Sequence, residues 1–145
     1  MATLPYRGKF HVEWYPKTAS HAFTEGDMVT ILNSAAGVGY LTSATSSSPQ
    51  VIGTIQKTVA STDSDYASTT KVPVLVGNTD AEWLFNAASG GAQTEVGQFV
   101  DAADDLLLDL GTAYTYGVAQ ITDVISSTQV LGKLCKKNGP SVTTA

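Results

Sequence analysis

The largest group of side chains that could do chemistry is a set of carboxylates between residues 101 and 109. Asp101, Asp104, Asp105 and Asp109 fall within one short stretch that carries no lysine or arginine. Carboxylate oxygens at such spacing could bind a hard cation such as Ca²⁺ or Mg²⁺, and paired carboxylates beside an aromatic residue could hydrolyse a glycoside. We favour solvated turn carboxylates, because aspartate is common in turns. The sequence therefore predicts no metal site and no catalytic residues.

The histidines and the cysteine also fail to form a recognisable catalytic or metal-binding set. The chain has 2 His and 1 Cys, whereas a structural zinc site needs about four nitrogen or sulfur ligands. His11 lies beside Trp14 and Tyr15, which indicates a packing or surface residue more than a general base. Cys135 alternates with lysines, so we expect it to face inward on a final strand as a buried thiol. Because no phosphate-binding loop and no nucleophile elbow occurs, we expect a protein that is not an enzyme and uses no cofactor.

Aromatic and basic residues are concentrated at the start of the chain. Residues 1–21 contain three basic residues, one acidic residue and two prolines, without a regular hydrophobic period. Such a segment is too aromatic for a disordered tail, and we expect an extended N-terminal arm that packs on its own domain or on a neighbour. Burial of its rings could supply binding energy, so deleting the arm should weaken binding without unfolding the domain. The candidate binding residues are Tyr6, Arg7, Lys9, Phe10, Trp14 and Tyr15, and further candidate interface residues are Trp83, Asp104 and Asp105.

The rest of the chain has short stretches with strand character, separated by turn-rich loops. Residues 27–32 and 51–57 alternate in character, and residues 71–76 form a β-branched run in which Pro73 favours an edge position. Residues 79–88 fit a short helix as well as another strand. These patterns predict an all-β protein, a small β-barrel or β-sandwich with at most one short helix.

The second half of the chain repeats the strand plan of the first. Each half has a strand opened by glycine, at Gly26 and Gly97, then a loop, a strand that contains glycine, a second loop and a closing strand. This pattern suggests two related β modules. The expected boundaries are an arm over residues 1–21, a β domain over 22–137 with half-repeats 24–77 and 95–136, and a C-terminal tail over 138–145.

Charge and hydropathy limit the partners that the protein can have. The chain of 145 residues carries 8 basic and 13 acidic side chains, a net charge of -5. Nucleic-acid binding normally needs a basic stripe that neutralises phosphates, so we expect no nucleic-acid partner. No apolar run approaches the roughly 20 residues that span a bilayer, and the first residues have no secretory-signal pattern. We therefore expect synthesis in the cytoplasm and no membrane partner.

Three stretches of the second half, residues 95–101, 116–122 and 126–134, resemble the head decoration proteins of tailed bacteriophages, also called cement or capsid-stabilising proteins. They contain a glycine-led strand, a Tyr-Gly-Val strand and a closing Val-Leu-Gly-Lys strand. The first half is similar to related β-barrel cement proteins in its Gly-Asp-Met-Val segment at 26–29 and its Lys-Val-Pro-Val segment at 71–74.

This resemblance implies a structural protein, without enzymatic activity, on the outer capsid surface of a virion. It implies binding to the major capsid protein, bridging of neighbouring capsid subunits and assembly as a homotrimer. The arm over residues 1–21 is longer than the resemblance requires, so a role for the arm in capsid binding is our own hypothesis.

Two other functions fit the sequence. A carbohydrate- or receptor-binding β module of a phage fibre or surface protein would carry Trp14, Trp83 or Tyr40 on an exposed platform. A small enzyme would use the carboxylates between residues 101 and 109 together with a divalent cation.

Overall fold

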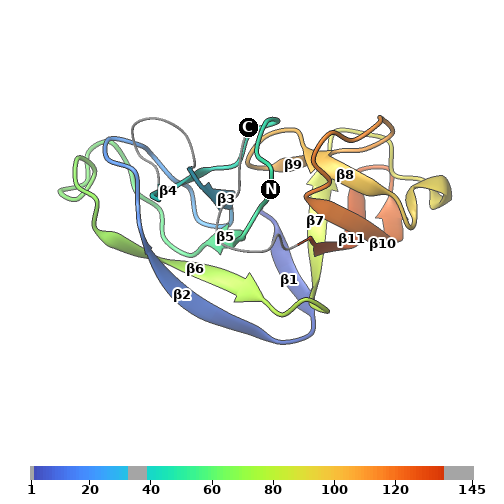
Figure 1. Ribbon diagram of the computed structural model, residues 1–145, viewed down its shortest axis with the longest axis horizontal. Helices are drawn as coiled ribbons and strands as arrows, with labels where there is room; N and C mark the ends of the chain where they lie inside the picture. The colour runs from blue at the N-terminus through green and yellow to red at the C-terminus, as the bar shows by residue number, and fades with distance from the viewer. Residues whose placement is uncertain (1, 33–38, 136–145) are drawn as a thin grey trace.

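Residues 2–32 and 39–135 are described by the computed structural model of the chain, and they form two β-sheets (Figure 1). Within these residues the single helical element is a 3-10 turn, Gln93–Glu95. The prediction of an all-β protein with at most one short helix is therefore confirmed. The predicted C-terminal tail, residues 138–145, lies outside the described residues.

Each sheet draws its strands mainly from one half of the chain. The first sheet contains β2 (Phe10–Pro16), β3 (Met28–Ile31), β4 (Leu41–Ser43), β5 (Gly53–Ile55) and β6 (Lys71–Gly77). The second sheet contains β1 (Leu4–Arg7), β7 (Glu82–Ala87), β8 (Phe99–Ala102), β9 (Leu107–Asp109), β10 (Ala119–Ser126) and β11 (Gln129–Leu134). The stretch 79–88, which fits a helix or a strand by sequence, thus contains the strand β7.

The second sheet closes into a barrel. Its strand order is β1-β7-β11-β10-β8-β9, and β9 also pairs in parallel with the end of β7, at Asn86 and Ala87. The other part of the same β7 edge, from Glu82 to Leu84, pairs with β1. Because the strands from β7 to β11 form a closed ring, each of them has a neighbour on both sides.

The first sheet has the same connectivity. Its order is β2-β6-β5-β3-β4, and the five strands β7 to β11 of the second sheet have the order β7-β11-β10-β8-β9. If each set of five strands is numbered along the chain, the order in both sheets is first, fifth, fourth, second, third. The third strand, β4, returns to the first through one parallel bridge between Lys17 and Leu41. There the Thr18 N–H donates to the Leu41 carbonyl at 2.9 Å. The fold is therefore two copies of one five-stranded barrel topology.

The repeat noticed in the sequence corresponds to this duplication. Gly26 and Gly97 come just before β3 and β8, the second strand of each set, and have φ of 93° and 90°. Side chains other than glycine are strained at these φ values, which explains why a glycine opens the strand in both halves. The half-repeats predicted at 24–77 and 95–136 start one strand late, because β2 and β7 are the first strands of the two sets.

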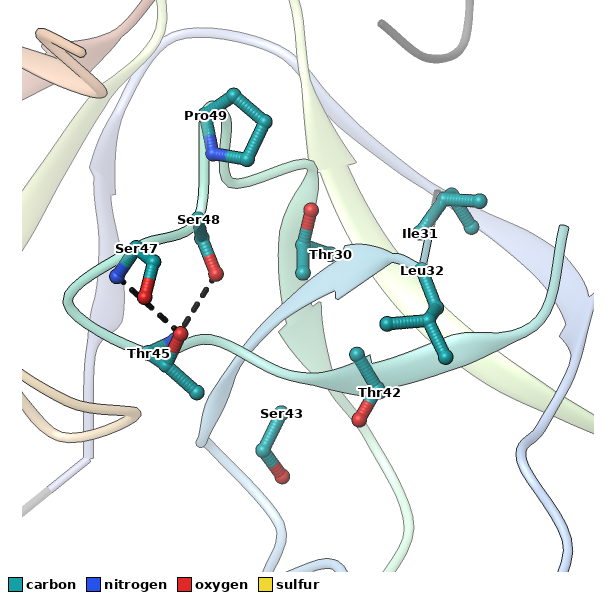
Figure 2. Close-up of a pocket in the computed structure, with 9 residues that line it drawn as sticks. All are labelled: Thr30, Ile31, Leu32, Thr42, Ser43, Thr45, Ser47, Ser48 and Pro49. Atoms are coloured by element: carbon teal, nitrogen blue, oxygen red, sulfur yellow. Dashed lines mark hydrogen bonds between the residues drawn. The ribbon is translucent and has the colours of Figure 1, made fainter. Parts of the chain in front are cut away.

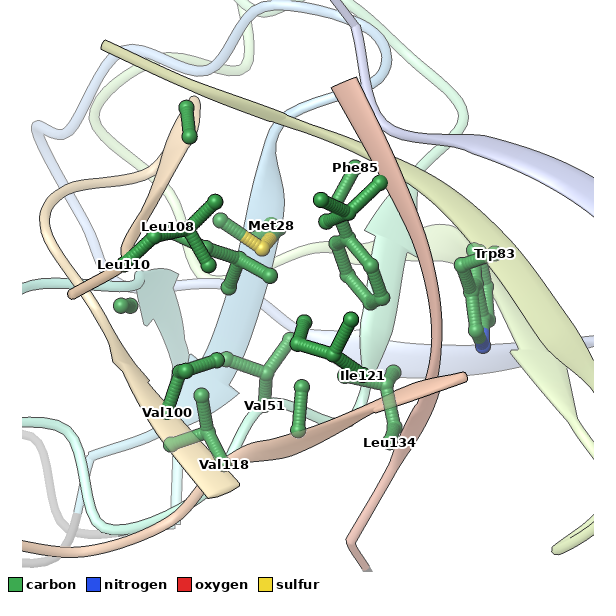
Figure 3. Packing of buried hydrophobic residues seen from close by; sticks show 14 of the residues in the cluster. Met28, Val51, Trp83, Phe85, Val100, Leu108, Leu110, Val118, Ile121 and Leu134 are labelled. Carbon is green, nitrogen blue, oxygen red and sulfur yellow. The ribbon is translucent and has the colours of Figure 1, made fainter. Parts of the chain in front are cut away.

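Two clusters of buried side chains stabilise the fold. The interior of the first sheet is mainly aliphatic, with Val29 and Val72 fully buried, and it also contains the ring of Phe23. The larger cluster surrounds Phe85 of β7 and also contains Met28 of β3 (Figure 3). Because β3 belongs to the first sheet, the larger cluster joins the two sheets into one unit. Full burial of each such side chain contributes about 1.5–3 kcal/mol.

Backbone and ring contacts also fix the two sheets together. The Met28 N–H donates to the Asp105 carbonyl at 2.8 Å. The Phe10 ring of β2 packs edge-on against Trp83 of β7, with ring centroids 5.0 Å apart. Edge-to-face pairs of this kind contribute about 0.5–1.5 kcal/mol beyond their buried area. The joint between the barrels is therefore packed and specific.

The predicted N-terminal arm is extended, but it is not a separable appendage. β1 pairs with β7, and β2 pairs with β6 along an unbroken register from Phe10↔Gly77 to Pro16↔Lys71. Deleting residues 1–21 would remove both strands and their ladder hydrogen bonds. The domain is therefore not expected to stay folded without them, contrary to the sequence-based expectation.

Pro73 lies in a central strand and not at an edge, so that prediction is wrong. β6 runs between β2 and β5. The β5 strand ends at Ile55, opposite Val74, and the Pro73 carbonyl accepts the Gln56 N–H at 2.9 Å. The missing N–H of proline thus falls just beyond the last β5 pair, where the sheet loses no ladder hydrogen bond.

Candidate functional site: an exposed aromatic and basic surface

Four of the six predicted binding residues lie on the surface of β1 and β2. Tyr6 and Trp14 are 53% and 60% exposed, and Arg7 and Lys9 are exposed as well. Strand alternation also brings apolar side chains of the same strands to the surface. We call the following six exposed residues the β1–β2 surface: Leu4, Tyr6, Arg7, Lys9, Val12 and Trp14.

Arg7 is held in place by the second barrel. Its Nε lies 2.7 Å from Oε1 of Glu82, and its guanidinium carbon lies 5.5 Å from the centroid of the Tyr6 ring, a cation–π distance. The Thr122 hydroxyl donates to the other Glu82 oxygen at 2.5 Å. The hydrogen bond from Thr122, followed by that from Arg7, lowers the pKa of Glu82. Tyr6 and Arg7 are therefore oriented before any partner binds.

Phe10 and Tyr15, the other two predicted binding residues, are half-buried. Phe10 packs against the larger cluster and Tyr15 against the cluster of the first sheet. The Tyr15 hydroxyl donates to the Glu13 carboxylate, and burial together with Glu13 raises the pKa of Tyr15 to about 12. These two rings pack β2 against the buried clusters, so they stabilise the β1–β2 surface but are not among its exposed residues.

His11 is a surface residue, as the sequence predicts. Alternation along β2 places it on the opposite face from Val12 and Trp14. Its Nε2 lies 2.7 Å from Oε2 of Glu13, and both side chains are largely solvent-accessible. The pair is an exposed ion pair when His11 is protonated, and such pairs contribute little to stability.

The three residues predicted as a further interface serve the fold. Trp83 is 1% exposed because it faces the interior between β7 and its neighbours, so the prediction that it lies at an interface is wrong. Asp105 is half-buried at the joint between the barrels, where its carbonyl accepts the Met28 N–H. Asp104 is exposed, and its carboxylate accepts two backbone N–H groups of the turn that follows, at 2.8 and 2.9 Å. Both aspartates thus have local structural roles.

The other carboxylates of this stretch do not assemble a cation site. The Asp101 carboxylate accepts the N–H groups of Thr115, Tyr116 and Gly117 at 2.7, 2.8 and 2.8 Å, which shapes the loop before β10. Across residues 2–32 and 39–135, no group of three or more His, Cys, Asp or Glu side chains is placed to hold a metal ion.

A small polar pocket lies beside β3 and β4 (Figure 2). Its volume is about 270 Å³, and it is lined by Thr30, Ile31, Leu32, Thr42, Ser43, Thr45, Ser47, Ser48 and Pro49. The loop at its rim is folded by its own hydrogen bonds, since the Thr45 N–H donates to Ser48 Oγ at 2.9 Å and the Ser47 N–H to Thr45 Oγ1 at 3.3 Å. This pocket could not be predicted from the sequence, because a stretch rich in serine and threonine is equally typical of a solvated loop.

Ser43 in this pocket is hydrogen-bonded to His21, with Oγ and Nε2 2.9 Å apart. Burial lowers the pKa of His21, so its ring is neutral at pH 7. A hydroxyl beside a neutral imidazole resembles an activated nucleophile, but acyl transfer also needs donors aimed at a developing oxyanion. The N–H groups of Thr45, Ser47 and Ser48 are bonded within the loop. We therefore assign no reaction to the pair.

Cys135 is half-buried, whereas the sequence predicts a buried thiol. It follows β11 directly, and its N–H donates to the Val118 carbonyl at 2.9 Å. It lines a shallow pocket of about 220 Å³ together with Phe99 and Tyr114, whose ring centroids are 5.7 Å apart. Tyr114 is 52% exposed, so this corner carries a second, smaller aromatic surface.

Comparisons with known proteins provide no family for the chain. No protein-family model matches the sequence, and no curated protein is significantly similar to it. In the part of the chain that the structure describes, no helix is long and apolar enough to cross a membrane. The function must therefore be inferred from the exposed residues of the β1–β2 surface.

Proposed function

We propose that the protein is a structural decoration protein of a phage head. It binds the outer capsid surface, contacts the major capsid protein and bridges neighbouring capsid subunits, and it has no enzymatic activity. The observation that carries the proposal is the β1–β2 surface, where Tyr6 and Trp14 are more than half exposed on strands that belong to two different sheets. Exposed aromatic side chains on a rigid frame are typical anchors of protein–protein contacts.

The charge of the β1–β2 surface supports the same proposal. Arg7 lies against the Tyr6 ring with its charge offset by Glu82. Lys9 is exposed in the link between β1 and β2, so the surface suits an acidic and apolar patch on a capsid subunit. Many copies on one shell multiply a modest affinity per site. The protein is made in the cytoplasm of the host and then joins the virion as a homo-oligomer. Neither a nucleic acid nor a membrane is a partner in this proposal.

Co-sedimentation with undecorated heads tests the proposal. The natural protein should sediment with the heads at micromolar concentration. The double variant Tyr6→Ala/Trp14→Ala should bind at least about tenfold more weakly, because aromatic anchors often contribute 2 kcal/mol or more. The matched control is Phe99→Ala/Tyr114→Ala, which removes two exposed rings from the other surface and should bind normally. The proposal would be contradicted if the natural protein did not sediment with the heads, or if both double variants lost binding to the same extent.

A second candidate function is a carbohydrate- or receptor-binding module of a phage fibre or surface protein. The observation that favours it is the exposed Trp14 ring, which offers a flat apolar face of the kind on which sugars stack. Binding on a glycan array that disappears with Trp14→Ala, combined with no binding to heads, would support this function over capsid decoration.

A further inference from the structure

Among the described residues, β2 has one paired edge and one open edge. The Lys9 carbonyl accepts the Asn78 N–H at 3.0 Å and the Lys17 N–H donates to the Thr70 carbonyl at 3.1 Å, so odd-numbered residues turn their backbone groups toward β6. Backbone groups of an antiparallel strand alternate between its two edges. The N–H and C=O groups of Phe10, Val12 and Trp14 therefore point away from β6. Figure 1 shows β2 as the outermost strand of its sheet, with β6 on its inner side.

The open stretch ends where the barrel closes. Thr18 is the next even-numbered residue after Pro16, and its N–H is bonded to the Leu41 carbonyl at 2.9 Å. In the described residues, β2 pairs with β6 alone, and its register with β6 has no bulge. Val12 and Trp14 also leave this edge apolar. A regular, apolar, unpaired edge is a template for pairing with another strand.

The internal repeat indicates that a strand belongs at this edge. β7 is the counterpart of β2, and its corresponding edge is filled by β9 at the end and by β1 at the start. In the first barrel β4 takes the place of β9. No strand of the described residues takes the place of β1. β1 is antiparallel to β7, so the vacant position beside β2 suits an antiparallel strand.

We propose that a second copy of the chain fills this position, with β2 pairing antiparallel to β2 of the other copy about a two-fold axis at Val12. In this register Val12 lies opposite Val12 of the second copy, and Phe10 lies opposite Trp14 of the second copy. Every outward N–H and C=O of these three residues then finds a partner in both chains. Pro16, which has no N–H, lies outside the ladder.

The side chains favour this register over the neighbouring one. With the axis at Val12, His11 lies opposite Glu13 of the second copy, a hydrogen-bonding pair that occurs twice by symmetry and carries opposite charges when His11 is protonated. With the axis at Glu13, that carboxylate would face its own copy, and Pro16 would enter the ladder opposite Phe10 without an N–H to donate. Like charges directly opposite each other destabilise a strand pair. The two-fold at Val12 is therefore the self-complementary arrangement.

Single cysteines introduced into a Cys135→Ser background test the register. Residues opposite each other in a hydrogen-bonded antiparallel pair have Cα atoms about 5.5 Å apart, within the range of a disulfide. Val12→Cys should therefore form a covalent dimer on mild oxidation. Trp14→Cys is the matched control, because its two copies would be four residues out of register, about 14 Å apart along the strands. Equal cross-linking at both positions, or at neither, would overturn the proposal.

Analytical ultracentrifugation of the natural chain tests the stoichiometry. We expect a dimer, and Val12→Lys should weaken dimerisation at least about tenfold because it places two ammonium groups at the axis. Ile125→Lys, on an equally exposed β10 residue, should leave the dimer intact. His11→Glu should also weaken the dimer, and His11→Glu/Glu13→Lys should restore it. A monomer, or the trimer implied by the phage resemblance, would overturn this proposal whether or not the protein binds heads.

Discussion

Lys17 is a fully buried lysine whose ammonium group is satisfied by backbone carbonyls. Its Nζ donates to the carbonyls of Tyr66 and Ser68 at 3.0 and 2.6 Å. The residue also carries the bridge to Leu41 that closes the first barrel. Lys17 therefore ties the loop before β6 to the closure point, and it contributes no charge to the surface.

Replacing Lys17 with methionine should destabilise the protein, because the half-buried Ser68 carbonyl loses its side-chain donor. The Tyr66 carbonyl, in contrast, keeps the Ser20 N–H at 2.8 Å. An unsatisfied polar group costs about 1–3 kcal/mol, so we expect the free energy of unfolding to fall by about that amount. Chemical denaturation measures the change. Lys71→Met, at an exposed position of β6, is the control and should change stability by less than about 0.5 kcal/mol. Equal stability of both variants would contradict the structural role of Lys17.

Asp27 is a second buried titratable residue, just before β3. Its carboxylate accepts the Thr24 N–H at 3.1 Å. Burial, together with the neighbouring Asp105 carboxyl and against the hydrogen bond from Thr24, raises the pKa of Asp27 to about 6. The folded state therefore binds a proton more tightly than the unfolded state.

The contribution of Asp27 to stability should consequently increase as the pH falls. The contribution of Asp27 is fully present below its ordinary pKa of 3.8 and is lost as the pH rises through about 6. Asp27→Asn should remove this pH dependence and should be more stable than the natural protein at pH 8, by about 1–2 kcal/mol. Urea denaturation at pH 5 and pH 8 measures both effects. Asp109→Asn, at an exposed position, is the control, and an unchanged pH dependence in Asp27→Asn would refute the assignment.

Exposure of single residues could be predicted from the sequence only in part. Tyr6 and Trp14 lie on the surface, as expected of binding residues, but burial does not alternate along β1 or β2, so composition and not periodicity indicated them. Trp83 lies in a segment that fits a helix as well as a strand, so the sequence does not decide which of its side chains face inward. The burial of Lys17 has no local signal, since its partners lie about fifty residues further along the chain.

At the scale of elements, the link between β1 and β2 is a close contact that only glycine permits. Gly8 has φ of 111°, and a Cβ added there would lie 2.8 Å from the Cα of Ala81. Gly111 has a similar left-handed φ of 81° but no heavy atom within 4 Å of an added Cβ. Substitutions at the two glycines therefore distinguish the cost of backbone strain from the cost of a steric clash.

Gly8→Ala should destabilise the protein more than Gly111→Ala. Backbone strain alone costs about 1–3 kcal/mol at either position, and the contact with Ala81 adds to it only at Gly8. Thermal unfolding of the two variants measures the difference. If Gly111→Ala were as destabilising as Gly8→Ala, the packing of the β1–β2 link against β7 would not limit stability.

The sequence predicted the strands near 28–31 and 71–77 well, because β-branched residues fill both. It predicted the first strand of each repeat poorly. β2 pairs with β6 and β7 with β11, so the partners of both strands are remote in the chain and leave no mark on the local pattern. The candidate surface could be predicted because its aromatic and basic composition is visible in the sequence. The polar pocket could not, because it forms only when a loop folds back beside β3.

At the scale of the whole molecule, duplication explains the architecture. Both halves follow one strand order, and within residues 2–32 and 39–135 the second barrel has an added strand, β1, that the first lacks. The proposed two-fold would extend each first sheet with that of its neighbour. Residues directly opposite in an antiparallel pair share a face, so both Trp14 side chains would point to the same side. A dimer of this form would present two binding surfaces to one flat receptor.

The two barrels also differ in how firmly they are closed, and this difference should set the order in which they open. Two consecutive parallel pairs close the second barrel, whereas a single bridge closes the first. Local opening starts where few hydrogen bonds and contacts must break. In native-state hydrogen exchange the Thr18 amide should therefore exchange faster than the β7 amides that face β9 and β11. The N-terminal barrel would then open locally more often than the C-terminal barrel. Slower exchange at Thr18 than at the β7 amides would contradict this order of opening.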